Sequence, residues 1–273
     1  MIEITRDEIE DVLLHVKKRH GHDFLNYSEA SMKRRITRFM GLCKIKSSVE
    51  LKTQLINNTQ VFSRFVDEIP VMHTEMFRDA ELYHTLQKEV FPYLATYPHP
   101  KIWHAACATG EEVYSVAIFL KEIKLLARCR IYATDINQKG LNTASKGRYP
   151  LKSLKVFQEN YQLAQGQKSL SDYYTTDGKY MQMATELRKP VIFSFHNLVT
   201  DGSFNEFNLI FCRNVLIYFN LELQNKVLRL LHNSLAPKGY LVLGNRESMH
   251  GSELQDKYDL IDEEARVYRK KIA

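Results

Sequence analysis

The spacing of apolar residues changes near residue 70 and divides the chain into two parts with different predicted structures. Before residue 70 the apolar positions recur at helical intervals. Thr5 and Glu8 have the spacing of a capping box at the start of the first helix. The apolar face of that helix consists of Ile9, Val12, Leu13 and Val16. Residues 1–70 therefore predict an N-terminal all-α domain.

The second predicted helix begins near Ser28 and combines an apolar side with a strongly basic side. Its apolar side holds Met32, Ile36, Phe39 and Met40. Its basic side consists of Lys33, Arg34, Arg35 and Arg38. Such a run of charge is equally typical of a solvated helix face and of a docking surface. Two further helices, over 49–55 and 61–66, would complete the domain.

Beyond residue 70, short β-rich runs alternate with helices, a pattern that predicts βαβ units and a largely parallel sheet. The predicted strands cover 101–106, 130–134, 191–196, 207–212 and 240–244, and the predicted helices 80–97, 112–126, 138–145 and 220–235. Residues 150–190 fit poorly, and their Asp177-Gly178 pair indicates a small helical piece with a β-hairpin inserted in the sheet domain. The predicted organisation is a helical domain (1–70), a linker and first helix (71–98), and a sheet domain (99–273).

The segment 101–115 and the strand after it have the pattern of a nucleoside-cofactor site. A strand leads into a turn of small residues, where Gly110 frees the backbone, and a helix follows. Asp135 ends the next strand. Its separation from the turn is close to the roughly 20 residues expected before a carboxylate that accepts ribose hydroxyls.

The details of the turn favour S-adenosylmethionine (AdoMet) over a dinucleotide. A pyrophosphate requires several exposed backbone N–H groups from a G-x-G-x-x-G turn, whereas this turn has one glycine. Glu111 and Glu112 follow it, and they would repel phosphate but attract a cation such as the α-ammonium of AdoMet. Taken alone, two acids at a helix N-terminus are equally typical of any α/β protein. Asp135 shifts the balance toward AdoMet.

Composition restricts the location and the partners. The net charge of +6 indicates an acidic partner, without choosing among nucleic acid, an anionic membrane surface and an acidic protein. The sequence has no apolar run near 18 residues and no signal-peptide pattern, so we expect a cytoplasmic protein. The four cysteines lack C-x-x-C spacing, so we expect no metal site and no disulfide framework.

Five collinear blocks resemble the CheR-type chemotaxis receptor methyltransferases. They read T-E-M-F-R-D (74–79), A-C-A-T-G-E-E (106–112), A-T-D-I-N (133–137), F-C-R-N-V-L-I-Y-F (211–219) and L-A-P-K-G-Y (235–240). The resemblance covers most of the chain, and the fourth block is its most specific element. It implies a helical N-terminal domain followed by a Rossmann-like class I methyltransferase domain with an inserted β-subdomain. Such an enzyme transfers a methyl group from AdoMet to glutamate side chains of chemoreceptor cytoplasmic domains, yielding methyl esters and S-adenosylhomocysteine.

The resemblance also implies roles for individual residues. It places Glu112 at the α-ammonium of AdoMet, Asp135 at the ribose, and Thr74 with Arg78 at the methionine end. Arg78 and Tyr218 are the predicted catalytic residues, with Tyr218 facing the transferred methyl. The predicted cofactor-binding set is Thr74, Arg78, Ala106, Gly110, Glu112, Asp135, Ile136, Asn197, Leu198, Cys212, Arg213 and Asn214. The basic face of Lys33, Arg34, Arg35 and Arg38 would then dock on acidic receptor helices.

The sequence differs from the family pattern at two places, and three other functions compete with this interpretation. Met72 stands where family members often have asparagine, and 244–248 reads G-N-R-E-S where the family has a G-H-S-E element. The alternatives are a non-catalytic AdoMet- or receptor-binding adaptor and a nucleic-acid methyltransferase. The sequence lacks an N-P-P-Y-like strand end and a P-C dipeptide, so we expect no nucleic-acid partner, and we expect a monomer. The single-glycine turn argues against a dehydrogenase.

Overall fold

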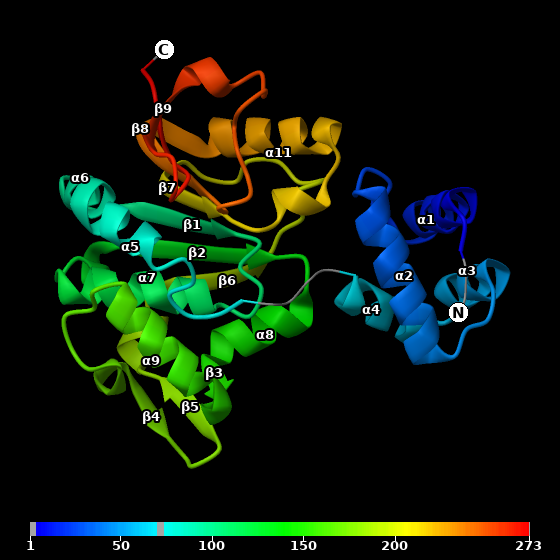
Figure 1. Cartoon of the computed structure of the whole chain (residues 1–273), viewed down its shortest axis with the longest axis horizontal. Coiled ribbons are helices and arrows are strands. Elements are labelled where there is room, and N and C mark those ends of the chain that lie inside the picture. The colour runs from blue at the N-terminus through cyan, green and yellow to red at the C-terminus, as the bar shows by residue number, and fades with distance from the viewer. Residues whose placement is uncertain (1–3, 70–73, 273) are drawn as a thin grey trace. The chain divides into compact units, whose positions relative to one another are not determined.

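The computed structural model describes residues 4–69 and 74–272, which group into two compact units (Figure 1). One unit comprises the N-terminal helices together with residues 216–226. The other comprises the remaining residues up to the C-terminus. Among the described residues, no helix is long and apolar enough to cross a bilayer.

The first unit is all-α, as the sequence predicts. Its helices are α1 (Arg6–His20), α2 (Glu29–Cys43), α3 (Ser48–Asn57) and α4 (Thr59–Glu68). The predicted capping box is confirmed, because the amide of Glu8 donates to the Thr5 hydroxyl (3.3 Å) and the Glu8 carboxylate accepts from the Thr5 amide (2.8 Å). Phe24, Phe39 and Phe65 pack edge to face in the core.

The basic side of α2 differs from the prediction at Arg35. Lys33, Arg34 and Arg38 are exposed, whereas Arg35 is only 7% exposed. Helical spacing explains the difference, because position 35 lies three residues after the buried Met32 and four before the buried Phe39. The exposed basic face therefore consists of Lys33, Arg34 and Arg38.

The second unit contains a seven-stranded sheet in the order β6-β2-β1-β7-β8-β10-β9. The strands are β1 (Lys101–Ala105), β2 (Arg130–Asp135), β6 (Val191–Phe195), β7 (Phe207–Cys212), β8 (Leu235–Leu243), β9 (Tyr258–Asp262) and β10 (Val267–Lys270). The first five strands of this order are parallel, and β10 and β9 are antiparallel additions. Chain order reverses at β1, between β2 and β7, and the crevice at the carboxyl ends of strands flanking such a point is where ligands bind in open α/β sheets. This is the predicted Rossmann-like fold.

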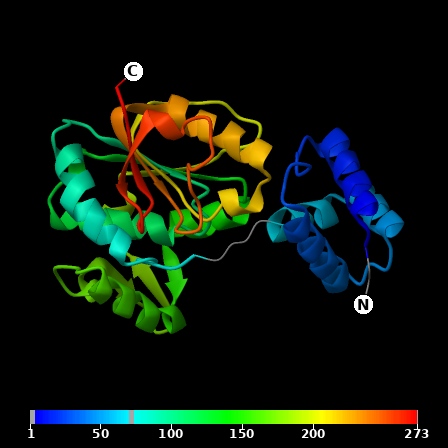
Figure 2. The same cartoon turned by 45° about the horizontal axis from the view of Figure 1, so that its top comes forward.

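Helices cover both faces of the sheet (Figures 1 and 2). α7 (Glu111–Glu122) and α8 (Gln138–Lys146) lie on one face and α11 (Leu221–Ser234) on the other. The predicted helix over 80–97 is interrupted: α5 (Glu81–Thr85) and α6 (Phe91–Ala95) flank a π-helical segment, Leu86–Val90.

An inserted subdomain follows α8. It contains β3 (Arg148–Pro150), α9 (Leu154–Leu163), β4 (Tyr174–Thr176), β5 (Tyr180–Met183) and α10 (Thr185–Arg188), with the strands in the antiparallel order β3-β5-β4. The predicted hairpin is confirmed between β4 and β5. Its turn is held by Asp177, whose carboxylate accepts from the amides of Lys179 (3.0 Å) and Tyr180 (2.9 Å).

Candidate active site

Strand register brings the predicted cofactor residues to one edge of the sheet. Ala105 of β1 pairs with Thr134 of β2 on one side and with Cys212 of β7 on the other. Because the three strands are parallel, the residues that follow them all emerge at the carboxyl edge. The loops that follow Ala105, Asp135 and Cys212, far apart in the sequence, therefore meet at the topological switch point.

The loop after β1 is tightly curved. Ala106, Ala108 and Gly110 have φ angles of 60°, 49° and 86°, all in the left-handed region. A side chain at position 110 would place its Cβ only 2.7 Å from the Cβ of Ala144 in α8. Gly110 is therefore required both by the turn and by the close approach of α8.

Asp135 ties this loop to the end of β2. Its Oδ2 accepts from the amide of Ala108 and its Oδ1 from the amide of Asn137, both at 2.8 Å. Burial raises the pKa of the Asp135 carboxyl, although these amides oppose the shift. The Ile136 amide also bonds this carboxylate, and three donors leave at least one of its roughly four acceptor sites for a ribose hydroxyl.

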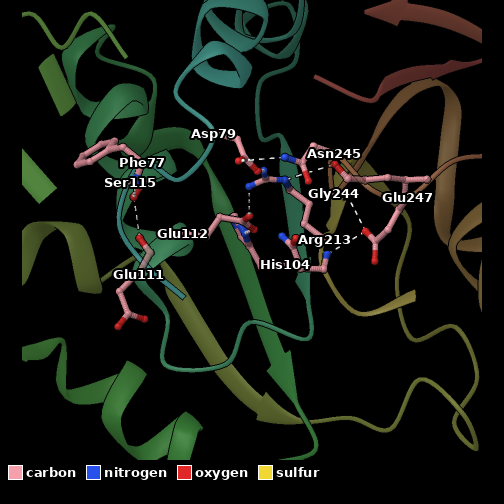
Figure 3. Close-up of polar contacts among 12 residues, drawn as sticks. Phe77, Asp79, His104, Glu111, Glu112, Ser115, Arg213, Gly244, Asn245 and Glu247 are labelled. Atoms are coloured by element: carbon pink, nitrogen blue, oxygen red, sulfur yellow. Dashed lines mark hydrogen bonds and ion pairs between the residues drawn. The ribbon is translucent and has the colours of Figure 1, made fainter. Parts of the chain in front are cut away.

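A buried arginine stands between two carboxylates at the centre of the site (Figure 3). Arg213 Nη2 lies 2.6 Å from Asp79 Oδ2, and Nη1 lies 2.8 Å from Glu112 Oε2. The Arg213 side chain is 4% exposed. Burial opposes its charge, but the Glu112 and Asp79 carboxylates outweigh this and raise the Arg213 pKa. Two carboxylates and one guanidinium give a net charge of −1 when His104, which contacts Glu112, is neutral, so the cluster can then accept an additional cation.

His104 holds the second oxygen of Glu112. Its Nδ1 lies 2.9 Å from Glu112 Oε1, and its ring stacks on Phe211 with 4.5 Å between centroids. Burial would raise the Glu112 pKa, but the hydrogen bond with His104 and the charge of Arg213 lower it to about 2. Glu112 therefore remains ionised throughout the physiological pH range. His104 Nε2 is buried and has no hydrogen-bond partner among the described residues.

Glu111 faces away from this cluster (Figure 3). Its carboxylate accepts from the Thr109 hydroxyl at 2.6 Å, and burial raises its pKa to about 7. Only one of the two acids at the start of α7 therefore joins the charged network.

Glu247 links the loop after β8 to the loop after β7. Its Oε2 accepts from the amides of Gly244 (2.7 Å) and Asn214 (2.8 Å), and Asn214 has a φ of 60°. The 244–248 element, which departs from the family pattern in sequence, thus holds the backbone of a predicted cofactor-binding residue.

This contact predicts a specific effect of Gly244→Ala. The added Cβ would lie 2.8 Å from both the Asn214 amide nitrogen and Glu247 Oε2, so the two loops must separate. We expect the free energy of unfolding to fall by about 1–3 kcal/mol, the usual cost of overpacking, when measured by urea denaturation. Gly202→Ala is the matched control, because its Cβ would meet nothing within 4 Å. Equal stabilities of the two variants would contradict the close contact of the two loops at Gly244.

Comparison with known proteins identifies the family. The model of the CheR methyltransferase SAM binding domain matches residues 72–267, and that of the CheR methyltransferase all-alpha domain matches residues 7–69. The chain belongs to the CheR methyltransferase family. It is therefore an AdoMet-dependent methyltransferase.

Relatives span both parts of the chain. Cher3 of Pseudomonas putida, which is classed by name among the methyltransferases, is 40% identical over 97% of each chain. The chemotaxis protein methyltransferase of Listeria innocua is 32% identical over 86% of this chain and 87% of its own. Among solved structures, the N-methyltransferase NodS from Bradyrhizobium japonicum has 14% identity over 63% of each chain and a TM-score of 0.35, too low to add to the assignment.

The remaining predicted cofactor-binding residues occupy varied environments. Asn197 is buried and accepts from the Val199 amide (2.9 Å). Leu198 is also buried, and Ile136 and Thr74 are half-buried. Arg78 is half-buried and makes no hydrogen bond or ion pair in the part of the chain that the structure describes.

Cys212 and Tyr218 complete the predicted set. Cys212 is fully buried, and burial raises the pKa of its thiol well above the usual value, which argues against a nucleophilic role. Tyr218 belongs to the segment 216–226, which groups with the helical unit. Met72 lies outside the described residues. No cluster of three or more metal-ligating side chains occurs among residues 4–69 and 74–272.

Three residues of the network escape prediction from the sequence. In the sequence, Asp79 is the residue after Arg78, His104 lies inside a predicted strand, and Glu247 lies in the divergent 244–248 element. The one sequence signal for Glu247 is its position three residues after Gly244, which matches the glutamate of the family's G-H-S-E element. The contact of His104 follows from its place on β1, and that of Asp79 from the path of the segment before α5.

Proposed function

We propose that this protein transfers the methyl group of AdoMet to glutamate side-chain carboxylates of chemoreceptors, yielding glutamate methyl esters and S-adenosylhomocysteine. The observation that carries the proposal is the network of Asp79, Arg213 and Glu112, which leaves one negative charge unbalanced at the switch point. Membership of the CheR family and the chemotaxis names of relatives such as that of Listeria innocua support the choice of acceptor.

The residues at the carboxyl edge fit AdoMet. Glu112, kept ionised by His104 and Arg213, would bind the α-ammonium, and Asp135 would accept the ribose hydroxyls. Arg78, which has no partner among the described residues, would bind the carboxylate of the methionine end. When bound, AdoMet supplies a methyl group activated by the sulfonium.

The chain's own chemical task is orientation rather than proton transfer. A glutamate side chain with a pKa of about 4.3 is already ionised at neutral pH, so the reaction needs no general base. Holding the acceptor oxygen in line with the methyl group can contribute about 7–11 kcal/mol. A cation bound tightly to the acceptor would weaken it as a nucleophile, so Arg78 serves better on the cofactor. The Tyr218 hydroxyl would direct the approaching carboxylate.

The proposal is tested by incubating the protein with tritiated AdoMet and a chemoreceptor cytoplasmic fragment. We expect label in the receptor that mild base releases as volatile methanol, because carboxyl methyl esters are hydrolysed under conditions that leave N-methyl groups intact. Base-stable label would contradict a carboxylate acceptor. Label in RNA or DNA would favour the nucleic-acid alternative, and binding of AdoMet without transfer would favour the adaptor.

The exposed basic face of α2 provides a separate prediction about docking. The double variant Arg34→Glu and Arg38→Glu should lower kcat/KM for receptor by about tenfold or more at low salt, because electrostatic steering is lost. The difference should shrink as salt screens the charges, and AdoMet affinity should stay unchanged. Arg19→Glu, at an exposed position of α1, is the control. Unaltered receptor methylation by the double variant would reject this surface.

A further inference from the structure

We propose that Arg35, on α2, is a positioning residue that orients the ring of Tyr218 for methyl transfer. The Arg35 Cζ lies 4.3 Å from the centroid of the Tyr218 ring, and Arg35 is only 7% exposed. This inference rests on the proposed function, because it concerns the residue expected to direct the acceptor carboxylate.

The environment of Arg35 is unusual for a structural arginine. A buried guanidinium is costly unless a carboxylate pairs with it. Among the described residues Arg35 forms no such ion pair. Its contacts are instead the Tyr218 ring face and the main-chain carbonyl of Ile69, to which Nη1 donates a hydrogen bond. A charge buried in this way against one aromatic ring indicates a role for that ring.

Several contacts fix the backbone around Tyr218 in the same helical unit. The amide of Ser28 donates to the Tyr218 carbonyl at 2.8 Å, and the amide of Asn220 donates to the Asn26 carbonyl at 2.9 Å. The next ring, Phe219, packs edge to face on Tyr27 with 4.9 Å between centroids. The backbone contacts hold the segment 216–220, and the planar guanidinium sets the plane of the Tyr218 ring.

Chain continuity gives this contact a functional consequence. Tyr218 follows Arg213 and Asn214 of the cofactor site after a few residues, and Ile69 lies at the end of the helical unit, shortly before Thr74. Within the helical unit, one guanidinium thus contacts both the carbonyl of Ile69 and the ring of Tyr218.

The test compares Arg35→Met, Arg35→Lys and Tyr218→Phe in receptor methylation by the full chain. We expect Arg35→Met to lower kcat by up to about 100-fold, as misplacement of a catalytic group does, with the receptor KM and the Kd for S-adenosylhomocysteine little changed. Arg35→Lys should restore little of the lost kcat, because an ammonium group lacks the planar face that stacks on the ring. Arg19→Met at an exposed position is the control.

A double-mutant cycle separates orientation from folding. If Arg35 acts through Tyr218, the variant carrying both Arg35→Met and Tyr218→Phe should be no slower than the slower single variant. Additive losses would overturn the proposal, as would a rise in the receptor KM with kcat unchanged. Thermal melts identify a variant that fails to fold. If Arg35→Met does not fold, Arg35→Lys replaces it in the double-mutant cycle.

Failure of the proposed function is distinguishable from failure of this inference. If the wild type does not methylate the receptor fragment, the acceptor proposal fails, and the orientation of the Tyr218 ring, measured by NMR through contacts of its ring protons, still tests Arg35. A changed or averaged ring orientation in Arg35→Met, but not in Arg19→Met, supports the positioning role. An unchanged orientation overturns it.

Discussion

Glu112→Gln is expected to abolish AdoMet binding in the micromolar range while leaving the protein folded. The substitution keeps the shape of the side chain but removes the charge that would face the α-ammonium. Truncating one partner of a desolvated charge pair costs about 2–5 kcal/mol, so affinity should fall at least about 30-fold. The measurement is titration calorimetry with AdoMet and S-adenosylhomocysteine.

Glu111→Gln is the matched control for this experiment. It makes the same chemical change one residue earlier in α7, at a side chain that faces away from the network (Figure 3). We expect its affinity for AdoMet to remain close to that of the wild type. Equal losses in the two variants, or no loss in Glu112→Gln, would contradict the role given to Glu112.

Arg213→Met is expected to produce the largest loss of stability. The Arg213 side chain is 4% exposed and contacts both Asp79 and Glu112, so its removal leaves two carboxylates facing each other without their shared cation. Removing one partner of a buried ion pair typically costs about 3–5 kcal/mol. Urea denaturation at neutral pH measures the change in the free energy of unfolding.

Neutralising the two acids should recover part of this loss. In the background of Arg213→Met, the further changes Asp79→Asn and Glu112→Gln remove the uncompensated charges while keeping the side-chain shapes. We therefore expect the triple variant to be more stable than the single variant. A single variant as stable as the wild type, or a triple variant less stable than the single one, would show that the network is not an electrostatic unit.

The fold class could be predicted, as could the local structure of the proposed cofactor site, because both depend on local patterns. The small-residue turn with Gly110, the acid that starts α7 and the acid that ends β2 follow from strand, turn and helix chemistry. The positive φ angles at Ala106 and Ala108 were not predictable, because alanine carries no signal for the left-handed region. These angles depend on the hydrogen bonds that hold the loop against the end of β2.

The charged network could not be predicted, because its members are distant in sequence. Arg213 contacts Glu112 across 101 residues and Asp79 across 134. The register of β1 and β7 brings Glu112 and Arg213 to the same sheet edge, and the segment before α5 brings Asp79 to them. Arg35 shows the opposite error: the helical pattern groups it with its charged neighbours, but its position beside Met32 and Phe39 places it in the interior. The pattern of charged residues does not predict that this arginine is buried, because burying a charged side chain costs free energy.

The most direct test of the account is calorimetric titration of the wild type with AdoMet and S-adenosylhomocysteine, repeated on Asp135→Ala. Asp135 is the residue on which the sequence pattern, the strand register and the predicted ribose contact converge. We predict micromolar binding of both compounds to the wild type and its loss in the variant. No binding to the wild type, or equal binding to the variant, would contradict a cofactor site at the carboxyl edge of β1 and β2.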